Sequence, residues 1–534
     1  MNIKKILIGL TAALSLIGCG VEEVKVDGPK RKLEGHVITE EPKAFTIFGI
    51  FLGKAFDGEL PVYQKAFEMT NVKLVGTASK NQSEEVQAFN LMISSGLIPD
   101  IIAYELTDEL EKLGIDGGLI PLENLIDEHA PNIKKFWEEN PRYKKDAIAA
   151  DGHIYMIPNY NDYFNLSCSQ GYYIRKDWLK KLGLEEPKTV DELYTVLKAF
   201  KEQDPNGNGK KDEVPLFLRA NINRKVMIAL TDIFKAQFVW YEKDGKPVFG
   251  PAEPEYKNAM INLAKWYKEG LIDQEVFTRG LSSRDYMLSN NLGGFTNDWF
   301  ASTGSYNEKL KDVIPGFDFS VLLPPEYNGN RKTATARPTY MGGWGISYKA
   351  KDPVTIIKYF DFWYSEEGRR LWNFGIEGDT YTLVDGKPQF TDKVLKNPEG
   401  KNALAVIRET GAQYRLGMFQ DAENEKQWAS DVTVRDMDEY MKNDAIQEPM
   451  PVLKYTKAEI RELLKIESQL RNVTEEMAQI WLLGVSDVEK DWDGYIERLN
   501  DIGLQRSKEI QQTAYDRFMK EDWLYIKLGG NNGD

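Results

Sequence analysis

The sequence has 534 residues and a formal net charge of −15 at pH 7. An acidic surface argues against nucleic acid as a partner, because binding to phosphates requires clustered Lys and Arg side chains. With two cysteines and three histidines, the chain has no basis for a disulfide framework and shows no spacing typical of a zinc site. Its length exceeds what one hydrophobic core normally organises, so we expect two lobes.

The N-terminus has the pattern of a secreted lipoprotein. Two lysines precede an apolar run, 6–17, that is too short to span a bilayer permanently, and the run leads into the lipobox-like residues LIGC ending at Cys19. We expect 1–18 to be a signal peptide and Cys19 to carry a lipid such as palmitate. The polar residues 19–42 then form a flexible tether to the bacterial cell membrane. The alternative is a plain secretory signal in which Cys19 is incidental.

The body of the chain begins with alternating strand and helix patterns. Three apolar runs have the length and composition of strands: 44–51, 72–75 and 99–103. Between the last two, Val86, Phe89 and Ile93 form an apolar stripe that predicts a helix over 84–95, ended by Gly96. Strand, helix, strand, helix, strand is typical of a parallel sheet covered by helices, so we predict an α/β fold.

A second unit of this kind begins near Tyr172. Thr189 and Glu192 have the spacing of a capping box, which predicts a helix that ends near Gln203. Residues 292–300 read as a strand that leads into a polar and aromatic turn. Long amphipathic helices are predicted over 256–269, 355–371, 457–480 and 492–518.

The loop 204–213 has the spacing of an EF-hand-like calcium site, in which several hard oxygens surround the ion and a Gly permits the sharp turn. The expected ligands are Asp204, Asn206, Asn208, the backbone carbonyl of Lys210, Asp212 and Glu213. Pro215 stands where such a loop normally carries a bidentate Glu, so Glu213 is the expected substitute. The ion would join the end of a helix to the next strand. The alternative is a polar turn without metal.

The stretch 171–216 resembles the calcium-containing solute-binding lipoproteins of bacterial ABC importers, especially those that bind alginate oligosaccharides. The same resemblance extends to 87–92, 266–273, 293–303, 373–378 and 514–517. It implies a two-lobed type II periplasmic-binding-protein fold with a hinge and an interlobe cleft. The implied N-terminal lobe is 43–167 plus about 340–395, and the implied C-terminal lobe is 168–339 plus about 396–534.

The resemblance implies a monomeric capture protein that is not an enzyme, lies on the cell surface or periplasmic side, and delivers its ligand to ABC permease subunits. We expect an acidic oligosaccharide, with unsaturated glycosaminoglycan disaccharides favoured over alginate oligosaccharides. The alternatives are neutral oligosaccharides, a surface adhesin or sensor of the same fold, and an extracellular polysaccharide-degrading enzyme. The last would need a carboxylate pair across the scissile bond, and no local acid/base motif is present.

Candidate ligand contacts follow from the resemblance and from side-chain chemistry. The resemblance places a sugar-stacking ring at Trp299; Trp428, Trp344, Tyr160 and Tyr340 are further aromatic candidates. Arg219 and Arg337 are the candidates for a carboxylate clamp. Ser167, Asn165 and Glu425 are candidates for hydrogen bonds to sugar hydroxyls. The alternative for each aromatic residue is core packing, and for each arginine a surface ion pair.

Overall fold

The structure is a computed structural model that describes residues 26–51, 53–79, 84–162, 168–220, 222–333, 340–399, 401–414, 416–429 and 431–520. The predicted signal peptide and the lipidation site Cys19 lie outside these residues. Within the described ranges, no helix combines the length and the apolar character needed to cross a membrane.

The first lobe is built on a six-stranded sheet in the order β16-β6-β13-β5-β1-β4. Its strands are β1 (Lys43–Phe48), β4 (Val72–Gly76), β5 (Ile101–Tyr104), β6 (Ile157–Asn161), β13 (Tyr340–Ile346) and β16 (Phe419–Gln420). β1 runs parallel to β4 and β5, whereas β13 is antiparallel to β5 and β6. The sheet is therefore mixed, with its parallel part formed by the strand and helix alternation that the sequence predicts.

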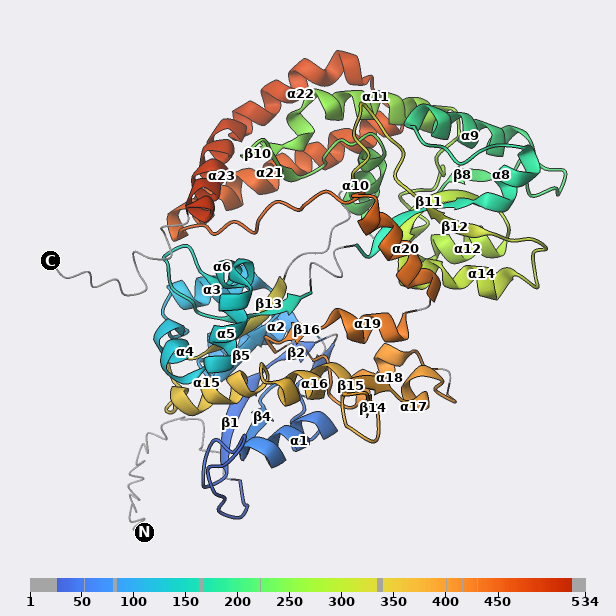
Figure 1. Cartoon of the computed structure of the whole chain (residues 1–534). Helices are drawn as coiled ribbons and strands as arrows, with labels where there is room; N and C mark the ends of the chain where they lie inside the picture. Colours follow the sequence, from blue (N-terminus) through green and yellow to red (C-terminus); the bar gives the residue numbers. More distant parts are fainter. Residues whose placement is uncertain are drawn as a thin grey trace, which may run out of the picture.

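Helices and two small hairpins surround this sheet (Figure 1). The helices are α1 (Pro61–Thr70), α2 (Glu85–Ser95), α3 (Thr107–Ile115), α4 (Glu123–His129), α5 (Pro131–Glu139), α6 (Pro141–Ala147), α15 (Pro353–Phe362), α16 (Glu366–Phe374), α17 (Asp392–Leu395), α18 (Ala403–Glu409) and α19 (Ala422–Trp428). The hairpins are β2 (Ile50–Phe51) with β3 (Lys54–Ala55), and β14 (Tyr381–Val384) with β15 (Lys387–Phe390).

The second lobe is built on a four-stranded sheet in the order β12-β7-β11-β8. Its strands are β7 (Gln170–Arg175), β8 (Val214–Leu216), β11 (Gly293–Trp299) and β12 (Phe319–Leu322), and β9 (Trp240–Lys243) with β10 (Lys246–Phe249) form a separate hairpin. The helices are α8 (Lys176–Leu182), α9 (Val190–Glu202), α10 (Asn223–Ile233), α11 (Pro254–Lys268), α12 (Ser283–Ser289), α13 (Phe300–Thr303), α14 (Ser305–Leu310), α20 (Asp431–Lys442), α21 (Lys457–Leu482), α22 (Val488–Ile502) and α23 (Leu504–Met519). The predicted α/β architecture is confirmed.

The chain passes between the two lobes three times, after β6, after β12 and after α19. Figure 1 shows α19 at the top of the lower lobe and α20 on the facing side of the upper lobe. The predicted boundary near residue 395 is wrong, because β16 pairs with β6 and Val406, Ile407 and Leu416 belong to the first-lobe core. The second segment of the first lobe therefore continues through α19.

Two local predictions can be compared directly with the structure. The capping box at Thr189 and Glu192 is present with both of its hydrogen bonds at the start of α9. Helix α2 is present with Gly96 in the left-handed conformation at its end. The predicted apolar stripe of α2 is only partly buried. Phe89 is buried, together with Ala88 and Met92, but Val86 is 51% exposed.

A buried carboxylate joins α15 to the start of α5. The carboxylate of Asp361 accepts hydrogen bonds from the backbone N–H of Ile133 at 2.8 Å and from the side chain of Asn132 at 2.8 Å. These bonds satisfy donors at a helix N-terminus. Burial outweighs them, however, and raises the pKa of Asp361 to about 6.

Stability should therefore depend on pH through Asp361. Its folded-state pKa of about 6 lies above the ordinary value of 3.8, so the folded protein keeps a proton that the unfolded chain has already released. Between these two values the free energy of unfolding should fall by up to about 1.4 kcal/mol for each unit that the pH rises, and the effect should be complete above about pH 7. Urea unfolding of the wild type and of Asp361→Asn, compared from pH 4 to pH 8, measures this slope as the difference between the two proteins. A pH-independent difference would contradict the assignment.

Candidate functional site

The most exposed of the candidate aromatic side chains whose surroundings are described is Trp299, at the C-terminal end of β11. β11 pairs with β7 in antiparallel register, with Trp299 opposite Gln170. Phe295, four residues earlier on the same face of the strand, is 1% exposed, whereas Trp299 is 46% exposed. The strand thus begins in the core and ends by presenting a large ring to solvent, which is the arrangement needed for stacking on a flat, partly apolar ligand.

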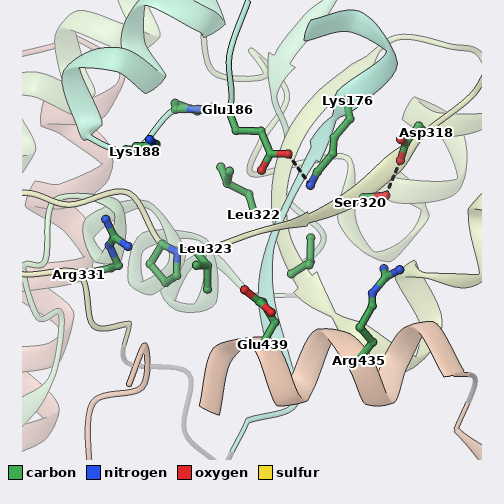
Figure 2. Close-up of a pocket in the computed structure, with 13 residues that line it drawn as sticks. Lys176, Glu186, Lys188, Asp318, Ser320, Leu322, Leu323, Arg331, Arg435 and Glu439 are labelled. Carbon is green, nitrogen blue, oxygen red and sulfur yellow. Dashed lines mark hydrogen bonds and ion pairs between the residues drawn. The ribbon is translucent and has the colours of Figure 1, made fainter. Parts of the chain in front are cut away.

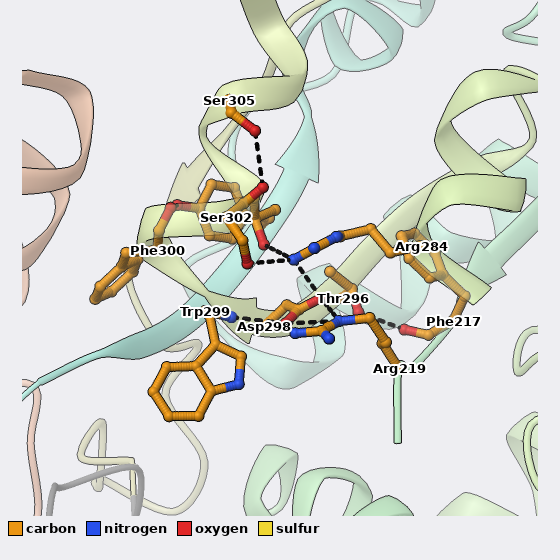
Figure 3. Close-up of polar contacts among 11 residues, drawn as sticks. Phe217, Arg219, Arg284, Thr296, Asp298, Trp299, Phe300, Ser302 and Ser305 are labelled. Carbon is orange, nitrogen blue, oxygen red and sulfur yellow. Dashed lines mark hydrogen bonds and ion pairs between the residues drawn. The ribbon is translucent and has the colours of Figure 1, made fainter. Parts of the chain in front are cut away.

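The residue before Trp299 holds two guanidinium groups. The carboxylate of Asp298 accepts hydrogen bonds from Nε and Nη2 of Arg219 at 2.9 and 2.7 Å, and from Nη1 of Arg284 at 3.1 Å. It also accepts the backbone N–H of Trp299 at 2.7 Å. Figure 3 shows the three charged side chains together, with the indole of Trp299 pointing away from them. Two cations share one buried anion, and the nearby carboxylate of Asp285 also acts on both guanidinium groups, so the charges of the cluster are close to balanced.

Arg284 is a residue that the sequence did not reveal. It projects from α12, and its Nη1 also donates to the hydroxyls of Ser302 and Thr303 at 2.7 and 2.9 Å, which ties α12 to α13. Burial lowers the pKa of Arg284, whereas the hydrogen bonds that Arg219 donates to Asp298 raise the pKa of Arg219. No motif marks Arg284, because its partner Asp298 lies on another element.

Two more predicted residues lie on α19 in the first lobe. Trp428 is half-buried against the core, and its indole N–H donates to the side-chain oxygen of Asn424 at 3.0 Å. Glu425 is buried, and its carboxylate accepts from the side chain of Gln420 at 3.3 Å. Trp299 and Trp428 therefore come from different lobes.

Two predicted contacts are wrong, because their side chains belong to the core. Trp344 is fully buried in β13 and stacks on Phe360. Tyr160 is 1% exposed, and its hydroxyl donates to the backbone oxygen of Tyr143 at 2.7 Å. Both residues lie on inner strands of the six-stranded sheet, where helices cover the side chains.

The other predicted contacts stay predictions. Tyr340 pairs with Tyr160 through the backbone of β13 and β6. Arg337, Ser167 and Asn165 lie outside the described residues.

The loop 204–213 folds around its own acidic and amide side chains. The carboxylate of Asp204 accepts the backbone N–H groups of Gly207, Asn208 and Gly209 at 3.0 to 3.1 Å. The amide of Asn208 donates to both oxygens of Asp212 at 3.0 and 3.2 Å. Gly207 and Gly209 have φ angles of 73° and 76°, which L-residues with side chains rarely adopt.

Glu213 gives the loop an unsatisfied oxygen. Its Oε2 is buried without a hydrogen-bond partner among the described residues. Burial raises the pKa of this carboxyl group, and the nearby carboxylates of Asp204 and Asp212 raise it further. A buried, unpartnered carboxylate oxygen beside two other carboxylates fits a bound cation. Within the part of the chain that the structure describes, no three His, Cys, Asp or Glu side chains form a metal centre by themselves, so a calcium ion here would also need the Asn and backbone oxygens.

A separate pocket of about 490 Å³ lies along β12, the edge strand of the second sheet. Figure 2 shows Lys176 paired with Glu186, at 2.7 Å, and Asp318 bonded to Ser320. The pocket is lined by charged side chains from α8, the 186–188 turn and α20. Its position along an outer strand separates it from the Trp299 cluster.

The chain belongs to the family of bacterial extracellular solute-binding proteins, whose family model matches residues 53–370. The predicted family is thus confirmed. The chain is 28% identical to the fructooligosaccharide ABC transporter substrate-binding protein FusA of Streptococcus pneumoniae serotype 4, over 95% of this chain and 97% of that protein. Among solved structures, alginate-binding protein AlgQ2 without calcium ion has a TM-score of 0.75 and 38% identity, covering 91% of this chain and all of that one. A FusA EF-hand mutant with fructo-nystose has a TM-score of 0.68 and 25% identity, covering 89% and 99% of the two chains.

Replacing the shared carboxylate should destabilise the second lobe. Asp298→Asn leaves two partly buried guanidinium groups without their anion, so we expect the free energy of unfolding to fall by about 3 kcal/mol. The matched control is Lys393→Ala, which breaks an exposed ion pair with Asp379 and should cost no more than about 0.5 kcal/mol. Urea unfolding followed by circular dichroism measures both variants. Equal losses in the two would show that the cluster around Asp298 does not stabilise the lobe.

Proposed function

We propose that this protein is the substrate-binding component of an ABC sugar importer and that it captures an oligosaccharide between its lobes without chemically changing it. The observation that carries this proposal is the exposed indole of Trp299 at the end of β11. Trp428 supplies a second aromatic ring from the opposite lobe. A ligand that contacts both rings favours the closed arrangement of the lobes, and closure is the form that a permease would recognise.

The finer proposal is that the oligosaccharide carries carboxylate groups. The guanidinium groups of Arg219 and Arg284 lie beside Trp299 and support an anionic sugar at that end of the site, where the carboxylates of Asp298 and Asp285 balance part of their charge. The related AlgQ2 is an alginate-binding protein. Unsaturated glycosaminoglycan disaccharides remain our favoured ligand over alginate oligosaccharides. The second candidate is a neutral oligosaccharide, which the similarity to the fructooligosaccharide-binding FusA favours.

We also propose that the loop 204–213 binds a structural calcium ion and that Cys19 carries the lipid anchor. The buried free oxygen of Glu213 supports the calcium site. The structures of AlgQ2 without calcium ion and of a FusA EF-hand mutant indicate that relatives have sites of this kind. The calcium ion would hold the end of α9 to the start of β8, at a distance from the sugar. Lipid on Cys19 would keep the monomer at the outer side of the membrane, close to its permease.

Ligand class can be tested with intrinsic tryptophan fluorescence. We expect a response to unsaturated chondroitin, hyaluronan or heparin disaccharides or to alginate oligosaccharides. Trp299→Ala and Trp428→Ala should each weaken binding by about fivefold, since one aromatic contact contributes about 1 kcal/mol. Trp492→Phe, in the C-terminal helices, is the matched control and should leave the affinity unchanged. A response to neutral fructo- or gluco-oligosaccharides alone would contradict the acidic ligand, and release of shortened products would contradict a pure binding protein.

Calcium removal should lower the thermal stability. If the ion binds only the folded chain and is present at about 100 times its Kd, EDTA should remove about 2.7 kcal/mol of stability, or about 2 to 3 °C in Tm for a chain of this length. Glu213→Gln should show a smaller response to EDTA, whereas Asp501→Asn, an exposed change on α22, should respond like the wild type. Elemental analysis should find one calcium per chain. An unchanged Tm with no calcium bound would make the loop a plain turn.

A further inference from the structure

A second pocket, of about 450 Å³, lies in the first lobe. It lies between the end of β6, helix α16, the β14–β15 hairpin and the start of α19. Its floor is apolar and includes Tyr364 and Phe374, and its walls carry six charged side chains. The volume lies in the range of small-molecule sites. We call this pocket the outer subsite.

The outer subsite adjoins the region between the lobes. Asp162, on its wall, directly precedes the first crossing of the chain, and α19 leads into the third. Glu423 lines the subsite near the start of α19, and Trp428 ends the same helix five residues later. At 1.5 Å per residue, these two residues are separated by about 7.5 Å along the helix axis. They are also about 140° apart around the axis, at about 100° per residue, so they lie on different faces of α19, and the outer subsite adjoins the region between the lobes through Asp162.

The β14–β15 hairpin is fixed to α19 at this point. The side chain of Gln427 accepts the backbone N–H of Phe390 at 2.9 Å and donates to the backbone oxygen of Pro388 at 2.8 Å. Gln427 is the neighbour of Trp428, so the wall of the outer subsite and the predicted stacking ring are held in one rigid unit. A preformed wall lowers the entropic cost of binding a ligand.

The charges of the outer subsite sum to a negative value. Arg369 contacts Asp421, and Arg370 lies 3.3 Å from Glu366, so both cations of the wall are paired. Two further carboxylates, Asp162 and Glu423, also line the subsite, and Lys426 approaches Glu423 at 3.5 Å. The pKa of Asp421 is raised, first by burial and also by the negative charges of Asp162 and Glu423. Carboxylates accept hydrogen bonds from sugar hydroxyls but repel another carboxylate.

We propose that the outer subsite binds a neutral sugar ring of the oligosaccharide held between the lobes. This inference rests on the proposed function, and it assigns the ligand one charged end and one uncharged end. Uronate groups belong at the arginine cluster beside Trp299, and an uncharged, hydroxyl-rich unit belongs beside α19. The pocket along β12 (Figure 2) has four cations against three carboxylates and lies on an edge strand of the other lobe, so it serves as the control.

The test measures how affinity changes with ligand length. Isothermal titration calorimetry compares alginate di- and tetrasaccharides, which contain only uronates, with sucrose and nystose, which are neutral. In the wild type, lengthening a neutral ligand should tighten binding by about tenfold, and lengthening the uronate ligand should change it by less than about threefold. In the double variant Arg370→Ala with Glu423→Ala, the increase in affinity on lengthening a neutral ligand should fall below about threefold. In Glu423→Lys, the gain for uronates should rise toward tenfold.

Lys188→Ala, in the pocket along β12, should leave both length gains as in the wild type, and circular dichroism verifies that each variant is folded. A length gain for neutral ligands that survives the double variant, or a tenfold gain for uronates in the wild type, would overturn the outer subsite while leaving the proposed function intact. If no oligosaccharide of either series or of the glycosaminoglycan panel binds at any length, the proposed function fails, and the outer subsite fails with it.

Discussion

The six-stranded sheet of this protein cannot form from a continuous stretch of chain. The first sheet needs β13 and β16, which follow β6 in the chain only after the whole second sheet has been built. Three crossings result, and each one begins or ends at a strand or helix that reaches the junction between the lobes. The C-terminal end of β11 and helix α19, which follows β16, both carry residues of the candidate site. A chain that must cross three times therefore collects side chains from distant segments into one region.

Asp298 is the electrostatic centre of the second-lobe part of that region. A carboxylate that is 2% exposed would be unfavourable alone, and its two guanidinium partners would be equally unfavourable without it. Together they fix the end of β11, the segment after β8 and helix α12 relative to one another. Because the anion also accepts the N–H of Trp299, the backbone that carries the exposed ring is held in the same network. The Trp299 ring can be exposed to solvent because the carboxylate that holds its backbone is buried.

The sequence predicts best those features that depend on near neighbours in the chain. The capping box of α9, the span of α2 and the turn around Asp204 each rest on residues within a few positions of one another, so spacing alone predicts them. The burial of Trp344 and Tyr160 depends on which strands are central in the sheet, and spacing does not contain that information. The same holds for Arg284, whose partner is on another element, and for residues 396–428, whose place depends on the pairing of β16 with β6. A tryptophan beside glycines has the same local pattern whether a helix or solvent covers it.

The loop 204–213 and the arginine cluster are connected through one short strand. β8 has three residues and begins directly after Glu213, and it pairs in parallel with β11 through Val214 and Leu216. Arg219 follows its end by three residues. A strand this short has few ladder hydrogen bonds to hold its register, so a fixed point at its start restricts where Arg219 can lie. An ion at 204–213 would therefore act on the binding region without touching the sugar: it would limit the positions from which Arg219 reaches Asp298, and with them the charge that lies beside Trp299.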